Sequence, residues 1–296
     1  MAGLGPRSEN ALFPGFDTVD VPVGGATIHA WIGGQGDPVL LLHGYPQTHA
    51  MWHGIAGELA RTHRVILADL RGYGDSVAHD GDFTFRAMAR DQVALMNHLG
   101  HSRFHVLAHD RGARTAHRMV LDHPATVRSV ALLDILPTLD VWRTMDGWLA
   151  QRYYHWMFLA QPGDMPRRLI SPDPVFFLHS ALIGLAGSDI FDPAAMAEYK
   201  RAARNPDVIA AWCGDYRAAA TTDLDHDRAD LGRISDIPCL VLWGSRGVVA
   251  HHIDPLAAWR AWFPAARGHA IDAGHFLAEE RPAEVLAAVE RHLDRG

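Results

Sequence analysis

A carboxylate at a strand-to-helix junction is the first candidate for chemistry in this sequence. The apolar run 104–108 ends in His109-Asp110-Arg111-Gly112, and a helical pattern follows at once. A strand, a tight turn with glycine and a helix form a junction that exposes a nucleophilic side chain, here Asp110. A carboxylate displaces leaving groups from sp³ carbon and forms an alkyl ester. The alternative is that Asp110 only caps the helix.

A nucleophilic carboxylate that forms an ester needs a base to activate water and an acid to orient that base. His275 lies within 272–276, between the last expected strand and the final helix, and is the expected base. Asp134 follows the strand 127–133 at the same edge of the sheet, so we expect it to hold the imidazole. Asp254, which lies well beyond the strand 238–243, is the alternative acid.

The loop 43–46 follows another expected strand and supplies a backbone donor. The N–H of Tyr45, together with that of Arg111, is predicted to form an oxyanion hole for the ester carbonyl. The turn 69–76 is interpreted as structural.

Two arginines should flank the nucleophile. Arg111 and Arg114 are three residues apart, on one face of the helix that follows Asp110. Guanidinium groups bind carboxylates in bidentate geometry, so the pair is interpreted as a fork for a substrate carboxylate. The alternative is a salt bridge to acids of the cap.

Hydrogen-bond donors recur in the middle of the sequence. His155 and Trp156 lie in an aromatic helical stretch, 153–158, and Tyr216 lies in another helical stretch. Imidazole, indole and phenol groups in a dry pocket are suited to stabilise a departing halide. Core packing is the alternative reading of these aromatic residues.

The elements that must position these residues follow an α/β pattern. Residues 19–23 and 27–32 predict a hairpin, and short apolar runs predict parallel strands at 39–42, 65–68, 104–108, 127–133 and 238–243. Helical patterns occupy 50–61, 86–99, 111–123 and 281–293. Between 137 and 234 no strand is expected. We therefore predict a doubly wound, mostly parallel sheet in two parts, 1–137 and 234–296, with a helical cap at 138–233.

Composition excludes several classes of protein. Hydrophobic residues make up 48% of the 296, and 27 basic against 34 acidic residues give a net charge of −7. This balance lacks the positive surface of a nucleic-acid binder. Apolar runs are too short to span a bilayer, and residues 1–16 are unlike a secretory signal. Two cysteines, Cys213 and Cys239, without a CxxC pattern argue against a zinc site. We expect a soluble, cytoplasmic protein.

Five motifs together resemble the fluoroacetate (haloacetate) dehalogenases of the α/β-hydrolase superfamily. They are HGYPQTHAMWH at 43–53, HDRGAR at 109–114, YYHW at 153–156, DYRAAA at 215–220 and DAGHFLAEE at 272–280. The resemblance spans essentially the whole chain. It departs from the pattern at Ala108, where the family usually has glycine.

The resemblance implies an α/β-hydrolase fold and a role for each candidate residue. Asp110, Asp134 and His275 correspond to the catalytic triad of the family. Arg111 and Arg114 correspond to its carboxylate clamp. The residues that correspond to its halide pocket are His155, Trp156 and Tyr216. It also implies a homodimer that needs no metal or organic cofactor. The expected substrate is a small haloacid, fluoroacetate or chloroacetate, converted with water to glycolate and halide.

Three other functions remain open. An epoxide hydrolase shares the Asp nucleophile and His base, and tyrosines such as Tyr153 and Tyr154 could protonate the opened ring. The paired arginines argue against it, as they do against a neutral haloalkane as substrate. A non-catalytic small-molecule receptor is disfavoured because all triad positions are filled. A metalloenzyme is suggested only by His49 and His53, four residues apart.

Overall fold

The computed structural model describes residues 12–187 and 189–294 of the chain. Residues 1–11, which carry most of the segment interpreted as unlike a secretory signal, lie outside these ranges. Within the described ranges, no helix has both the length and the apolar composition required to cross a bilayer.

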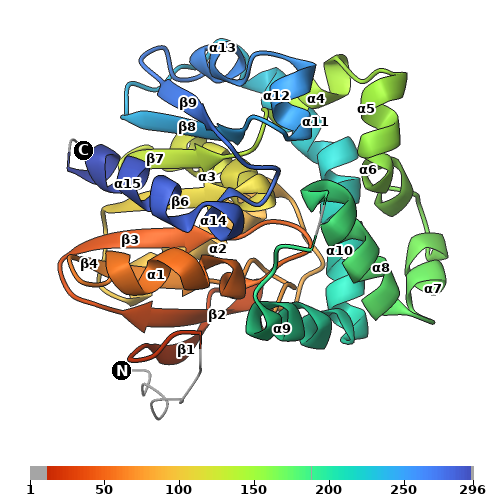
Figure 1. Cartoon of the computed structure of the whole chain (residues 1–296), viewed down its shortest axis with the longest axis horizontal. Coiled ribbons are helices and arrows are strands. Elements are labelled where there is room, and N and C mark those ends of the chain that lie inside the picture. The colour runs from red at the N-terminus through yellow and green to blue at the C-terminus, as the bar shows by residue number, and fades with distance from the viewer. Residues whose placement is uncertain (1–11, 188, 295–296) are drawn as a thin grey trace.

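The described residues form a nine-stranded sheet in the order β1-β2-β4-β3-β6-β7-β8-β9, with β5 paired to β2 (Figure 1). β1 and β2 form the expected antiparallel hairpin, and β3, β4 and β6 to β9 run parallel. The strands are β1 (Asp17–Pro22), β2 (Ala26–Gly33), β3 (Asp37–Leu42), β4 (His63–Ala68), β5 (Val77–Ala78), β6 (Phe104–His109), β7 (Val127–Leu133), β8 (Cys239–Gly244) and β9 (Arg267–Ile271). The predicted α/β fold class is therefore confirmed.

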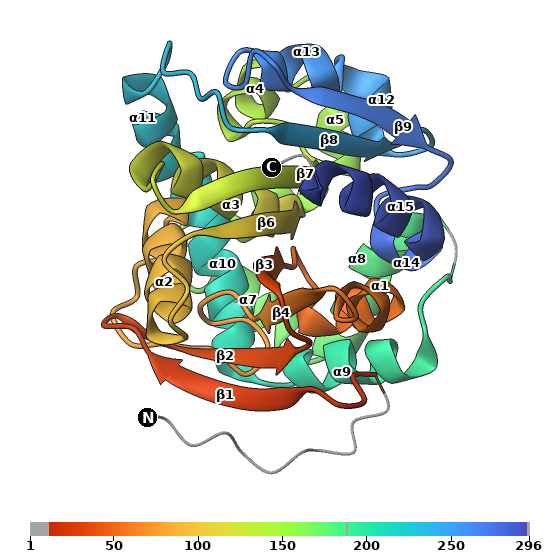
Figure 2. The ribbon, with the colours of Figure 1, turned by 90° about the vertical axis from the view of Figure 1, so that its left-hand side faces the viewer.

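Helices cover both faces of the sheet. Figure 2 shows α2 and α3 on one face and α1, α14 and α15 on the other. These helices and their neighbours are η1, a short 3-10 helix (His49–Trp52), α1 (His53–Leu59), α2 (Phe85–His98), α3 (Asp110–Asp122), α12 (Val248–His252), α13 (Pro255–Arg260), α14 (Leu277–Glu280) and α15 (Pro282–Leu293). The central strands are almost fully buried because they are covered on both sides.

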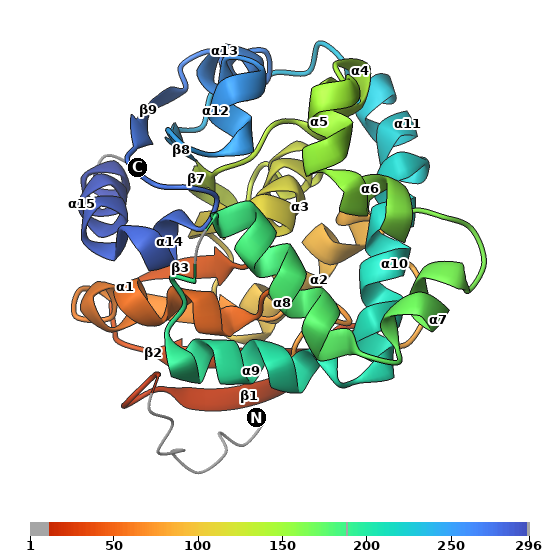
Figure 3. The ribbon, with the colours of Figure 1, turned by 45° about the vertical axis from the view of Figure 1, so that its right-hand side comes forward.

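The segment between β7 and β8 is helical throughout its described elements. Its helices are α4 (Thr138–Arg143), α5 (Gly147–Arg152), α6 (Tyr154–Leu159), α7 (Met165–Ile170), α8 (Pro174–Ala186), α9 (Pro193–Ala203), α10 (Pro206–Ala220) and α11 (Thr222–Ala229). Figure 3 shows α8, α9 and α10 standing in front of the end of the sheet. We call the segment Thr138–Ala229 the cap helices. The exact division at 138 and 233 stays a prediction.

Local sequence explains where three cap helices begin. Asp173-Pro174, Asp192-Pro193 and Asn205-Pro206 each place a side-chain acceptor before a proline in the first turn. The side-chain oxygen accepts a hydrogen bond from a backbone N–H in the first turn that has no partner within the helix. Proline has no backbone N–H that needs a partner, and its ring already fixes φ at a helical value. These starts fix the ends of α8, α9 and α10, which cover the site described next.

Candidate active site

Asp110 stands at the junction of β6 and α3 with a left-handed backbone, φ 47°. Its side chain is almost completely buried. Gly112 permits the tight junction, because a Cβ there would lie 2.4 Å from the carbonyl oxygen of His43. Ala108 needs no such freedom, since Asp110 and Asp134 are the only non-glycine residues with positive φ in the described chain. The predicted elbow is therefore present with alanine in place of glycine.

The loop after β3 contacts the nucleophile directly. The backbone N–H of Tyr45 donates a hydrogen bond of 2.9 Å to Oδ1 of Asp110. Gly44 lies so close that a Cβ would be 2.6 Å from the same oxygen. Oδ2 of Asp110 accepts no hydrogen bond from a described residue. The second predicted donor, the N–H of Arg111, belongs to the first turn of α3, where amides lack intrahelical partners.

His275 and Asp134 meet beside Asp110. Nδ1 of His275 lies 2.6 Å from Oδ2 of Asp134, whose Oδ1 accepts the backbone N–H of Gly244 at 2.9 Å. Asp134 also has a left-handed backbone, φ 44°. Asp254, the alternative acid, instead caps α13 by accepting two backbone N–H groups.

His109 contacts His275, and the sequence did not predict this contact. Nε2 of His109 lies 2.9 Å from the carbonyl oxygen of His275, so the imidazole donates there. The two rings are in contact, with centroids 4.6 Å apart. Burial and the neighbouring His275 lower the pKa of His109 to about 3, so it stays neutral. The only sequence signal was its place next to the nucleophile.

The charges suit a nucleophile and a base. Burial alone would raise the pKa of Asp110, but the positive charges of His275, Arg111 and Arg114 hold it below the ordinary value. Asp110 is therefore ionised at neutral pH. Burial alone would lower the pKa of His275, but the hydrogen bond and charge of Asp134 raise it above 6.5.

Arg111 is committed to a partner inside the protein. Its Nε donates to Oδ2 of Asp215 at 2.8 Å, and Nη2 pairs with Oδ1 and with the backbone oxygen of Asp215. Asp215 lies in α10, so the salt bridge to a cap acid that was the alternative reading is present. Only Nη1 of Arg111 has no partner among the described residues. Asp215, which Tyr73 also contacts at 2.7 Å, was quoted in a motif but not assigned a role.

Arg114 is unpaired. It is 3% exposed, and its guanidinium forms no hydrogen bond or salt bridge with any described residue. It lies 4.6 Å from the centroid of the Trp156 ring, while Arg111 lies 4.2 Å from that of Tyr216. Burial and the charge of Arg111 lower the pKa of Arg114 to about 10, which leaves it charged at neutral pH. A buried, unpaired cation calls for an anion.

A narrow cavity lies between the cap helices and the sheet. Its lining residues come from both parts: Tyr45, Asp110, Tyr153, His155, Trp156, Leu185, Tyr216 and His275. The structure thus brings the nucleophile, the base and the three predicted halide donors to one space. Burial lowers the pKa of His155 to about 3, so the imidazole is neutral.

The metal alternative gains no support from the geometry. Nδ1 of His49 is bonded to Asp69 at 3.0 Å, and His53 lies in the next helix. In the ranges 12–187 and 189–294, no three His, Cys, Asp or Glu side chains are grouped to hold a metal ion. Asp69 also accepts the backbone N–H groups of His49 and Asp75, as expected for a structural turn.

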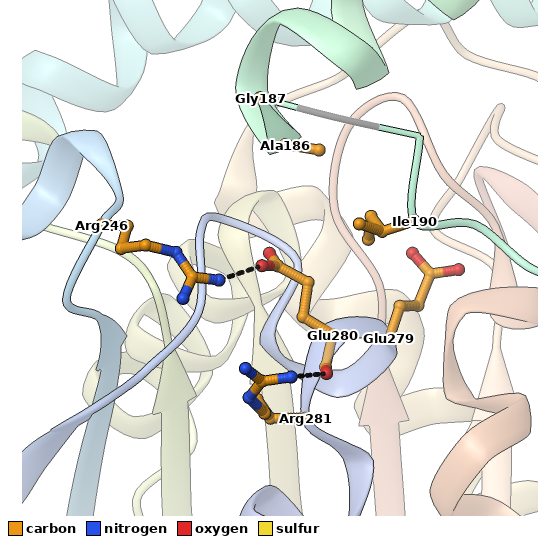
Figure 4. Close-up of a pocket in the computed structure, with 7 residues that line it drawn as sticks. All are labelled: Ala186, Gly187, Ile190, Arg246, Glu279, Glu280 and Arg281. Atoms are coloured by element: carbon orange, nitrogen blue, oxygen red, sulfur yellow. Dashed lines mark hydrogen bonds and ion pairs between the residues drawn. The ribbon is translucent and has the colours of Figure 1, made fainter.

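A larger cleft of about 650 Å³ opens on the surface beside this cavity (Figure 4). It lies between the end of α8 and α14, where Glu280 pairs with Arg246 at 3.3 Å. Leu185 lines the cavity and Ala186 lines the cleft, so the two spaces are neighbours. Figure 4 shows Glu279 at the far side of the cleft from Arg246.

Comparisons with known proteins place the chain in a family. Residues 37–282 match the model of the alpha/beta hydrolase fold. A fluoroacetate dehalogenase from Burkholderia sp is 41% identical over 95% of both chains. The chain belongs to the haloacetate dehalogenase family. This family membership makes it an enzyme of the hydrolase class, as the sequence predicted.

Members of neighbouring families and solved structures agree on the fold. A soluble epoxide hydrolase from Corynebacterium sp. (strain C12) is 31% identical over 89% of this chain and 92% of its own. An α/β hydrolase from Nostoc sp PCC 7120 has a TM-score of 0.92 at 46% identity, covering 95% of this chain and 99% of the other. The haloacetate dehalogenase family and epoxide hydrolases thus share this architecture.

Proposed function

We propose that this enzyme hydrolyses 2-haloacetates to glycolate and halide through an ester of Asp110. The observation that carries the proposal is the unpaired, buried Arg114 beside an ionised Asp110. The cation supplies a receptor for a substrate carboxylate, and the aspartate supplies a nucleophile for sp³ carbon. The similarity to a fluoroacetate dehalogenase supports the same substrate class.

The first step is a displacement. The substrate carboxylate binds Arg114 and the free Nη1 of Arg111, which brings the α-carbon against Oδ2 of Asp110. The carbon–halogen bond breaks as the carbon–oxygen bond forms, and the halide leaves with the bonding electrons. N–H and O–H groups of His155, Trp156 and Tyr216 stabilise the developing negative charge.

The second step is hydrolysis of the ester. His275, oriented by Asp134, takes a proton from water, and the resulting hydroxide attacks the ester carbonyl. Oδ1, which already accepts the N–H of Tyr45, becomes the oxyanion in the tetrahedral intermediate. Its collapse releases glycolate and restores Asp110. The N–H of Arg111 is proposed as the second donor to this oxygen.

Halide release tests the proposal. The purified protein should release fluoride or chloride from fluoroacetate or chloroacetate, with an equal amount of glycolate, and Asp110→Ala should release none. A single turnover in ¹⁸O-labelled water separates covalent from direct attack. Unlabelled glycolate is expected, because its new oxygen comes from Asp110. Label in the first glycolate would reject the ester, and no halide from either acid would reject the function.

Arg114 should determine substrate binding more than catalysis. Replacing it with Gln removes a charge-assisted contact worth about 1.5–3 kcal/mol, so KM for chloroacetate should rise about 10- to 100-fold. Arg143→Gln is the matched control, because Arg143 is exposed on α4. Steady-state kinetics on both variants would show the effect. An unchanged KM in Arg114→Gln would reject the clamp.

We also infer that the protein works as a homodimer in the cytoplasm and needs no metal or organic cofactor. Exposed apolar side chains on neighbouring cap helices α7 and α8, Leu169 and Phe176, support the dimer. They are 65% and 69% exposed, and apolar side chains exposed together are a feature of protein–protein contact sites.

A further inference from the structure

Three phenols that line the cavity, those of Tyr45, Tyr153 and Tyr216, have no hydrogen-bond partner among the described residues. Tyr153 and Tyr216 both line the space around Asp110 and are 7% and 2% exposed. Neither of these two hydroxyls forms a hydrogen bond with another described residue. A buried tyrosine hydroxyl usually finds a partner, so these two groups are available to a ligand. Burial raises the pKa of both, so each carries its proton at neutral pH.

Haloacetate hydrolysis requires no transfer of these protons. A halide ion is stable in water and leaves without a proton, so hydrogen bonding is all that it requires. A site with a carboxylate receptor, a nucleophile and a proton-bearing phenol has the groups for a more basic leaving group. An alkoxide is such a group, because its conjugate acid is far weaker than a phenol.

We propose that the same site also hydrolyses oxirane-2-carboxylates, of which glycidate is the smallest, to 2,3-dihydroxy acids. The inference rests on the proposed function, since it uses the same nucleophile and clamp. Glycidate carries its carboxylate on the carbon that also bears the ring oxygen, just as chloroacetate carries carboxylate and chlorine on one carbon. It exceeds chloroacetate by a single heavy atom, which matters in so narrow a cavity.

The proposed reaction has two steps that balance. Oδ2 of Asp110 attacks C2, the C2–oxygen bond breaks, and the electron pair goes to the oxygen that remains on C3. Tyr216, placed where the halide would depart, donates its proton to this oxygen. His275 then activates water, the ester is hydrolysed, and the proton taken from water replaces the one that Tyr216 gave. The sum is glycidate plus water to glycerate, inverted at C2.

The arginines exclude neutral epoxides and select charged ones. Arg114 and Nη1 of Arg111 remain buried without partners unless an anion is bound. A neutral ring such as glycidol leaves them unsatisfied, which costs binding free energy. The two arginines therefore argue against neutral epoxides as substrates, but not against epoxides that carry a carboxylate.

Parallel assays test the proposal. Glycidate, glycidol and chloroacetate are incubated with the enzyme and with Asp110→Ala in ¹⁸O-labelled water over many turnovers. We expect glycerate, with the label on C2 and inverted configuration there, and no diol from glycidol. Chloroacetate turnover without glycerate would overturn this inference and leave the proposed function standing. Turnover of neither acid would overturn the proposed function and this inference with it.

A tyrosine variant tests the proton donor. In Tyr216→Phe, the ratio of glycidate to chloroacetate turnover should fall about 100-fold, because only the epoxide needs the proton. Tyr154→Phe is the matched control, since Tyr154 is 45% exposed and does not line the cavity. Because both turnover rates are measured on the same preparation, their ratio does not depend on the fraction of the variant that is folded. An unchanged ratio in Tyr216→Phe, or label on C3, would overturn the proposed attack and donation.

Discussion

At the scale of single residues, the site depends on opposite shifts of two pKa values. Buried Asp110 is kept ionised by the surrounding cations, and buried His275 is made more basic by Asp134. Asp110, the proposed nucleophile, is therefore ionised at any pH near neutral, and His275, the proposed base, changes its charge in that range. His275 must be neutral to accept a proton from water.

We consequently expect kcat to fall as the pH is lowered, and the midpoint of this fall to lie above pH 6.5. The pKa of His275 is raised above that value, so protonation begins as the pH falls through the raised pKa. Esterification removes the charge of Asp110, but Asp134 contributes more to the raised pKa and stays charged. A profile of kcat against pH would measure the midpoint. A midpoint well below 6.5 would contradict the assignment of the base.

Two asparagine variants form a matched pair for this profile. Asp134→Asn should shift the acid limb to lower pH and reduce turnover about 100-fold or more, because the imidazole loses its partner. Asp254→Asn should leave the limb unchanged, since Asp254 caps α13 and asparagine caps helices equally well. A shifted acid limb in Asp254→Asn and an unchanged limb in Asp134→Asn would show that Asp254, and not Asp134, orients His275.

At the scale of elements, the turn between β6 and α3 holds Asp110 in a conformation that costs free energy. A non-glycine residue in the left-handed region is disfavoured by about 1–2 kcal/mol, and surrounding packing maintains it. Gly44 and Gly112 provide the close packing on either side. The element thus determines where the carboxylate points.

Two inactive variants should reveal this cost. Asp110→Gly and Asp110→Ala both lack the carboxylate, so they differ mainly in how well they tolerate φ 47°. We expect the glycine variant to be more stable by about 1 kcal/mol. Chemical denaturation measures both free energies of unfolding. Equal stabilities, or a more stable alanine variant, would mean that the turn relaxes when the carboxylate is absent.

The elements around the site were largely predictable from sequence, and its side-chain partners were not. Apolar runs without alternation identified the central parallel strands, and chain order predicted a pair, His275 and Asp134, whose side chains are in contact. The two-residue strand β5 has too little pattern to detect. The predicted helix 50–61 covers α1 and all of η1 except His49, and the sequence did not separate the short 3-10 turn from the α-helix that follows it.

Contacts between distant segments explain what was missed. Asp215 and Arg111 are 104 positions apart, and no local pattern indicates that one binds the other. Similarly, the bond from His109 to the backbone of His275 depends on how two loops meet. Residue types predicted the chemistry available at the site, whereas partner choice depended on tertiary packing.

At the scale of the whole molecule, a buried carboxylate joins the cap helices to the sheet. Glu279 of α14 accepts hydrogen bonds from Tyr199 of α9 at 2.9 Å and from Gln47 at 2.6 Å. Burial raises the pKa of Glu279 to about 8, despite both hydrogen bonds. The folded protein therefore binds a proton there that the unfolded chain releases near pH 4.5.

This proton should make stability depend on pH. The contribution of Glu279 is fully present below about pH 4.5 and is lost as the pH rises through about 8, because the folded pKa is raised. Glu279→Gln, which cannot ionise, should lose less stability than the wild type between pH 6 and pH 9. Thermal unfolding at several pH values gives the comparison. Parallel curves for the two proteins would show that Glu279 does not titrate in this range.

The salt bridge between Arg111 and Asp215 bears on how such enzymes can be recombined. Arg111 belongs to α3, which packs on the sheet, and Asp215 belongs to α10 of the cap helices. Their salt bridge holds the guanidinium group that we propose receives the substrate carboxylate. A chimera that takes residues 138–229 from another hydrolase inherits a new chemical partner for Arg111 along with a new lid over the cavity. Without an acid at the position of Asp215, the buried guanidinium of Arg111 loses its orientation. A chimera of this kind must therefore keep an aspartate at position 215, even though the rest of the cap helices is exchanged.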